Sequence, residues 1–158
     1  MLIETKCITE FAKIYGTTWL VNAIVISSIL FMAFIANYLV IKKIKINFII
    51  NYLLIFLTIF IGYYLFTNVE TKLNIIFYPI ILTLPILFSG IAFSRELLKI
   101  NSTSQALSAN ILGAMVGGFL EYNSMYFGFS FLYVLAAFLY FLAFLTSKYK
   151  KNLINNLV

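Results

Sequence analysis

Five long, predominantly apolar runs alternate with short polar segments along the chain. A helix that crosses a bilayer needs about 20 consecutive apolar residues, and each run is close to that length. The pattern therefore predicts an all-α, polytopic bundle of about five transmembrane helices. The runs cover approximately residues 19–41, 48–66, 75–93, 103–122 and 127–146.

The first 16 residues differ from these runs because they mix charged and apolar side chains. One helical face contains Ile3, Cys7, Phe11 and Ile14. We place Lys6, Glu10 and Lys13 mostly away from that face. This pattern predicts either an interfacial helix or a partial helix at the frayed end of a spanning one.

Composition supports a membrane environment for the whole chain. Of its 158 residues, 63% are hydrophobic and 10% are charged, and the mean hydropathy is +1.03. Soluble domains are about 45–50% apolar and about 25% charged, and a chain of this size cannot hide so much apolar surface from water. We find no linker or internal repeat, so residues 1–158 are predicted to form one membrane domain in contact with the lipid bilayer.

Basic residues are concentrated on one side of the predicted topology. The loop 42–47, the loop 94–105 and the C-terminal tail share that side, and Lys and Arg in short loops favour the cytoplasm. The C-terminus is therefore predicted in the cytoplasm and the N-terminus outside, in the inner (cytoplasmic) membrane. A net charge of +6 beside apolar runs suits lipid headgroups, and no nucleic-acid partner is expected. The cytoplasmic set is Lys42, Lys43, Lys45, Arg95, Lys99, Lys148, Lys150 and Lys151, against Lys6, Lys13 and Lys72 outside.

Several kinds of chemistry are excluded by the residues that the chain lacks. It has no His, no Asp and a single Cys, so a Ser-His-Asp triad, a His metal site and a Cys zinc cluster cannot form within it. We expect no catalytic residue, cofactor or metal ligand. A membrane-embedded enzyme would depend on Glu121 alone as its acid or base.

The run 103–122 carries the most informative pattern, because its small and polar residues fall within about a 100° sector of a helix. Gly113 and Gly117 form a GxxxG pair, followed directly by Gly118, and such pairs let another helix approach closely. One interpretation is a tight helix–helix seam with Asn110 bonded across it and Glu121 reaching the outer headgroups. The other is a polar pocket or pathway lined by Asn110 and Glu121, since a carboxyl facing lipid is costly. The sector contains Ala106, Asn110, Gly113, Ala114, Gly117 and Glu121.

Two asparagines raise the same pair of alternatives on the first run. Asn22 and Asn37 share a side of the helix and are roughly 22 Å apart along its axis. They are expected either to bond neighbouring helices or to line a pathway. On the third run, Pro85 is expected to kink the helix, and together with Gly90 it forms either a packing distortion or a gating kink.

Three stretches resemble one known membrane region. ETKCITEFAKIYGTTWLVNAIVISSILFMAFIANYLV (4–40), YPIILTLPILFSGIAFS (78–94) and the segment 106–145, with SANILGAMVGGFLEY as its most specific part, are similar to the C-terminal transmembrane region of bacterial spermidine-synthase-like proteins. In that family, major-facilitator-like helices are fused to a Rossmann-type aminopropyltransferase-like domain. No GxGxxG motif and no Asp are present here, so the resemblance implies the membrane part without the transferase activity.

Two functions remain as hypotheses. The first is a non-enzymatic membrane module that packs with or anchors a soluble transferase-like partner. The alternative is half of a small-molecule, polyamine-type transporter that oligomerises, because five spans are few for a complete transporter. Both imply other membrane helices as partners, from a homo-oligomer or a partner subunit. The chain is expected to be either a stand-alone membrane half or a truncated reading frame.

Overall fold

The computed structural model describes residues 2–44, 46–68, 77–100 and 102–156, and over these ranges it contains helices and no strand. The predicted all-α class is confirmed. The helices are α1 (Leu2–Tyr15), α2 (Trp19–Ile41), α3 (Phe48–Asn68), α4 (Phe77–Leu97), α5 (Thr103–Glu121), α6 (Ser124–Phe127) and α7 (Phe131–Asn156).

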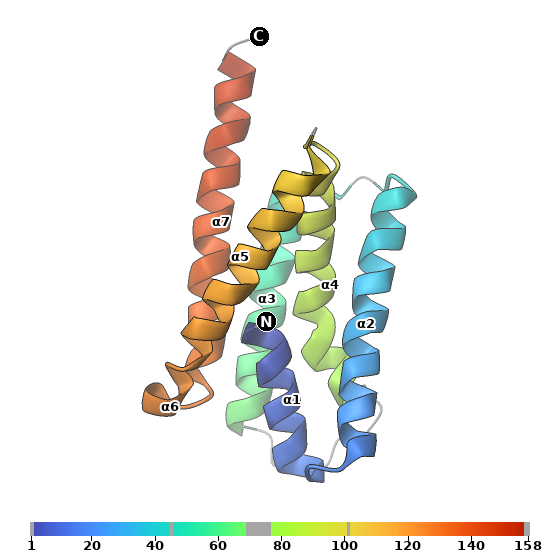
Figure 1. The fold of residues 1–158 in the computed structure, drawn as a ribbon, viewed down its shortest axis with the longest axis vertical. Helices are drawn as coiled ribbons and strands as arrows, with labels where there is room; N and C mark the ends of the chain where they lie inside the picture. The colour runs from blue at the N-terminus through green and yellow to red at the C-terminus, as the bar shows by residue number, and fades with distance from the viewer. Residues whose placement is uncertain (1, 45, 69–76, 101, 157–158) are drawn as a thin grey trace.

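Four long helices run along the length of the bundle. Figure 1 shows α2, α3, α4 and α7 roughly parallel to the long axis, with α5 crossing them obliquely. Helix α4 is central, because it packs on α2 and on α3, while α3 also contacts α7. Helix α1 begins about midway along the bundle and runs to the end at which α2 begins (Figure 1), in contact with α2, α4 and α7.

Among the described helices, four are long and apolar enough to cross a membrane, namely α2, α3, α4 and α7. Helix α5, which corresponds to the predicted fourth span, is not among them. Large apolar side chains are exposed on the candidate spans, as lipid-facing surfaces require; examples are Phe31, Phe34, Phe60 and Phe138. The chain therefore has the character of a multi-pass membrane protein.

Helix boundaries agree with the sequence pattern except at two places. The predicted loop 94–105 is too long, because α4 continues to Leu97 and α5 begins at Thr103. The last predicted span is replaced by the short helix α6 and by α7, which continues well beyond residue 146. The polar turn that contains Glu70 and Lys72 lies outside the described residues.

The sequence YGTT separates α1 from α2 and reverses the chain. Gly16 has a φ of +89°, and its N–H donates to the Ala12 carbonyl at 2.9 Å, which is a left-handed helix C-cap. The side chain of Thr18 then accepts from the N–H of Val21 and caps the start of α2. These two caps make α1 a separate helix that folds back on the bundle.

A second capping motif closes α2 at the other end of the bundle. Lys43 has a φ of 55°, and the N–H groups of Lys43 and Ile44 donate to the carbonyls of Val40 and Leu39. This is the Schellman arrangement, here formed without glycine. Arg95 of α4 then holds the loop that follows, because its guanidinium donates to the carbonyls of Ile44 and Ile46.

Helix α1 is buried among the other helices, and two of its charged residues are buried with it. Lys6 and Glu10 have side chains that are 0% and 1% exposed. Their placement away from the apolar face was therefore wrong. At 100° per residue Glu10 lies only about 20° from Ile3, so both belong to one buried face.

Candidate functional site

The small and polar stripe of α5 lines a cavity between the helices, and Asn110 and Gly113 of this stripe are exposed. The cavity has a volume of about 550 Å³ and lies between α5 on one side and α1, α4 and α7 on the other. Glycine and alanine form most of its α5 wall, so the side chains there take up little space. Every predicted member of the stripe except Glu121 lines it: Ala106, Asn110, Gly113, Ala114 and Gly117.

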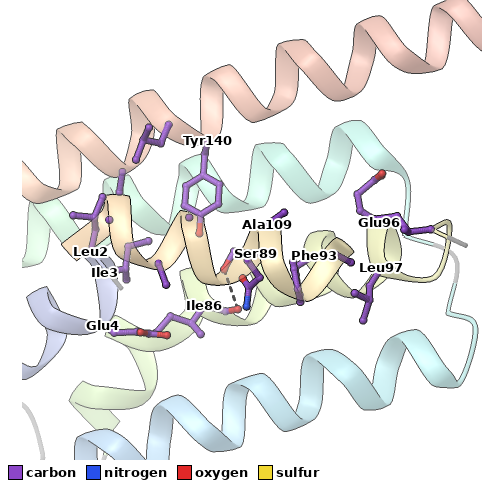
Figure 2. Close-up of a pocket in the computed structure, with 18 residues that line it drawn as sticks. Leu2, Ile3, Glu4, Ile86, Ser89, Phe93, Glu96, Leu97, Ala109 and Tyr140 are labelled. Atoms are coloured by element: carbon purple, nitrogen blue, oxygen red, sulfur yellow. Dashed lines mark hydrogen bonds between the residues drawn. The ribbon is translucent and has the colours of Figure 1, made fainter. Parts of the chain in front are cut away.

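The opposite wall is mostly apolar, with a few polar groups distributed along it. Figure 2 shows Glu4 and Glu96 toward opposite ends of the cavity, with Ser89 and Tyr140 between them. Glu96 is ion-paired with Lys99 at 2.6 Å. No Lys or Arg is present among the described lining residues. The lining therefore favours positive over negative charge.

Gly113 and Gly118 of α5 do not form a tight seam within this chain, whereas Gly117 is buried. A Cβ added at Gly113 or at Gly118 would meet no atom within 4 Å. Close helix approach occurs elsewhere: a Cβ at Gly90 of α4 would lie 2.9 Å from the Cβ of Ala36, and one at Gly62 of α3 would lie 3.2 Å from the Tyr133 hydroxyl. Gly62 and Gly90, at which an added Cβ would meet another helix closely, lie outside the GxxxG pair.

Glu121 and Asn37 both take part in contacts between helices. Thr5 of α1 donates its hydroxyl to Glu121 Oε1 at 2.6 Å, which links the end of α5 to α1. Ser94 of α4 donates to the Oδ1 of Asn37 on α2. Asn22 is half-buried in the first turn of α2. The four predicted polar residues are not brought together, since only Asn110 lines the cavity.

A buried charge cluster joins α1 to α7, and the sequence analysis missed it. Lys6 Nζ lies 2.6 Å from Glu10 Oε1, and Tyr133 donates its hydroxyl to Glu10 Oε2 at 3.2 Å. The ammonium also lies 5.3 Å from the centroid of the Tyr133 ring. The i, i+4 spacing of an opposite-charge pair beside Cys7 and Phe11 was the available signal.

This cluster has the features of a structural connection. Both charges are desolvated, so each depends on the other and on Tyr133 for stabilisation. Next to it, the Cys7 thiol donates to the Leu82 carbonyl of α4 at 3.3 Å. Together these contacts attach α1 to two of the candidate spans.

Comparison of the chain with family models, with curated proteins and with solved structures gives no significant match. The similarity to spermidine-synthase-like proteins therefore stays a prediction.

Proposed function

We propose that this chain is a non-enzymatic membrane module that is completed by helices of another subunit docking along α5. The observation that carries the proposal is the open space at Gly113, where an added Cβ would meet no atom of the chain within 4 Å. In spanning helices, such small residues allow the backbone of another helix to approach closely. The cavity beside the stripe has room for side chains from that helix.

The proposal includes five crossings, in which α5 is the fourth along the chain, and a cytoplasmic C-terminus. The distribution of charge supports it. Most of the basic residues are in the α2–α3 and α4–α5 connections and near the C-terminal end of α7. These three parts lie at one end of the bundle (Figure 1). Reporter fusions after Lys43, after Lys99 and after Lys151 should all give a cytoplasmic signal. A fusion near Glu70 should give an external one. A cytoplasmic signal near Glu70 would exclude this topology.

The partner that we propose is a transferase-like protein; if it is fused to further membrane helices these dock along α5, and if it is soluble the docking helices come from a second copy of the chain. This rests on the resemblance of residues 4–40 and 106–145 to the membrane region of spermidine-synthase-like proteins. The chain would then anchor or orient the partner's catalytic domain at the membrane. A second copy of the chain is the other source of docking helices.

Single-cysteine cross-linking in native membranes tests the docking. Cys7 is buried and is the chain's one cysteine, so Cys7→Ser provides a background that keeps a hydroxyl donor to Leu82. In that background Gly113→Cys should cross-link to a second polypeptide with a short thiol-to-thiol or thiol-to-amine reagent. The product's mass distinguishes a second copy from a different subunit.

The matched control is Ile111→Cys on the same helix. Ile111 is 68% exposed and is not part of the cavity lining, so it should remain uncross-linked in the same membranes. Equal cross-linking from both positions would indicate random collision. No product from Gly113→Cys, at normal protein yield, would reject docking along α5.

The second candidate function is binding of a small organic cation, as in half of a polyamine-type transporter. The favouring observation is the cavity itself, because about 550 Å³ lies in the usual range for ligand pockets. Glu4 lies toward one end of the cavity (Figure 2), which suits an ammonium group, while Glu96 toward the other end already pairs with Lys99. Purified protein should then bind spermidine, and Glu4→Gln should weaken binding while Glu121→Gln, outside the cavity, should not. Absence of binding by the unmodified protein would remove this candidate.

A further inference from the structure

A second cavity lies at the basic end of the bundle, away from the α5 stripe. It has a volume of about 400 Å³ and is formed by α3, the second half of α4 and the α2–α3 connection. Phe48, Tyr52 and Leu98 give it an apolar wall, while Asn51, Arg95 and Lys99 give it polar groups. The cavity is therefore amphipathic.

Asn51 lines this cavity, and its amide oxygen is an unused hydrogen-bond acceptor. The residue is 2% exposed, and its Nδ2 donates to the Phe88 carbonyl of α4 at 3.1 Å. That contact fixes the orientation of the amide, because a carbonyl accepts and only the NH₂ group can donate to it. The Oδ1 is buried and has no hydrogen-bond partner among the described residues. A buried acceptor without a donor is unfavourable, so the site favours a ligand with a hydroxyl or N–H group.

Arg95 provides the complementary positive charge. Its guanidinium donates to the carbonyls of Ile44 and Ile46, which uses two of its five N–H groups and holds its plane in position. The remaining N–H groups suit a phosphate oxygen, since guanidinium binds phosphate with matched geometry. The side chain is thus positioned for an anion while it also fixes the loop.

The charge of the lining defines how strongly negative the ligand should be. Arg95 and Lys99 each contribute +1 and Glu96 contributes −1, so the described lining has a net charge of +1. This value complements a single phosphodiester better than a multiply charged phosphate. Lys148 adds positive charge nearby, because its Nζ lies 5.9 Å from the Phe144 ring, which stacks on Phe48.

We propose that this cavity binds an anionic phospholipid whose headgroup carries a free hydroxyl, of the phosphatidylglycerol type. The phosphodiester is bound by Arg95 and Lys99, and a headgroup hydroxyl donates to Asn51 Oδ1. The acyl chains follow the apolar wall. A lipid is favoured over a soluble phosphate because exposed apolar side chains of α3, such as Ile49 and Leu53, continue from the same end of the helix as a lipid-facing surface.

Lipid competition tests the proposal with the full chain in nanodiscs or detergent. The bound fraction of phosphatidylglycerol is measured by native mass spectrometry against phosphatidylcholine, which lacks net charge, and phosphatidylmethanol, which keeps the phosphodiester but lacks the hydroxyl. We expect phosphatidylglycerol to be preferred over phosphatidylmethanol by about fivefold, the effect of one hydrogen bond. Its preference over phosphatidylcholine should be larger. Equal retention of all three lipids would overturn the proposal.

Two variants and one control locate the site. Asn51→Leu should abolish the preference for phosphatidylglycerol over phosphatidylmethanol, and Lys99→Gln, at an exposed position that leaves the fold intact, should reduce the preference over phosphatidylcholine. Lys43→Gln is the control, since Lys43 is at the same end but does not line the cavity. An equal loss in Lys43→Gln would indicate general attraction to the basic surface and reject the site. Displacement of the lipid by millimolar glycerol phosphate would equally reject a lipid ligand.

Discussion

Helix α4 faces α2 and α5 in opposite ways. On the α2 side, Gly90 lies so close to Ala36 that an added Cβ would be 2.9 Å from it, and Ser94 bonds to Asn37. On the α5 side, Gly113 faces a cavity of about 550 Å³. Gly90 of α4 is thus in a closed contact, whereas Gly113 of α5 is in open space. Glycine density in the sequence therefore does not indicate where two helices of the chain are in closest contact.

The buried charge pair of α1 lies in another closed contact, between α1 and α7, and the largest effect is expected there. Lys6→Met leaves Glu10 buried without its cation, so it should reduce the free energy of unfolding by about 3–5 kcal/mol. Lys6→Met combined with Glu10→Met should recover most of that loss, because an apolar pair has no desolvation cost. The measurement is reversible unfolding in mixed micelles.

A small loss from Lys6→Met would contradict the buried placement of α1. Exposed ion pairs contribute about 0–1 kcal/mol, so a loss in that range would mean that Lys6 and Glu10 reach water. Helix α1 would then be an interfacial helix, which is one of the two alternatives predicted from the sequence.

The next prediction compares the stability of variants at two glycines. Gly90→Val should destabilise the protein by about 1–3 kcal/mol, because its side chain must displace Ala36 and the α2 backbone. Gly118→Val is the matched control, since no atom lies within 4 Å of its added Cβ, and it should change stability by less than about 0.5 kcal/mol. Equal losses in the two variants would mean that Gly90 is not more closely packed than Gly118.

A smaller loss of stability is expected when the hydrogen bond between α2 and α4 is removed. Asn37→Leu should cost on the order of 0.6 kcal/mol, the average for such bonds between membrane helices. A double-mutant cycle with Ser94→Ala should give a coupling energy of the same size, because Ser94 is the donor to Asn37. Absence of coupling would show that the pair contributes nothing to the closed side.

Much of the fold could be predicted from the sequence, because apolar run length depends on local composition. The run 19–41 matches α2 at both ends, since Thr18 caps its start and the Schellman turn follows it. The end of α4 could not be predicted in this way. Ser94 and Arg95 look like loop residues, but one bonds to α2 and the other to the α2–α3 connection, and these contacts extend the helix.

The candidate site was predicted only in part. Residue spacing identified the face that Asn110, Gly113 and Gly117 share, and that face does line the cavity. Spacing alone could not show whether the facing helix fills the space, because this depends on how α5 is held by distant contacts such as Thr5 to Glu121. The burial of Lys6 and Glu10 could be predicted from their angular positions on the helix, but their charge argued for exposure.

The smallest effect on stability gives the sharpest information about α5. Gly113→Leu places its side chain in open space within the chain, so the free energy of unfolding of the isolated protein should change by less than about 0.5 kcal/mol. If another subunit docks along the stripe, the same side chain occupies the space that the partner's helix needs, and the cross-linked or co-purified complex should be lost. The complex is measured by cross-linking at a second position, Ala109→Cys, in the Cys7→Ser background. A stable Gly113→Leu protein that still assembles fully would show that α5 faces lipid or a small ligand there. Loss of stability in the isolated protein would instead mean that α5 lies closer to α4 than the cavity implies.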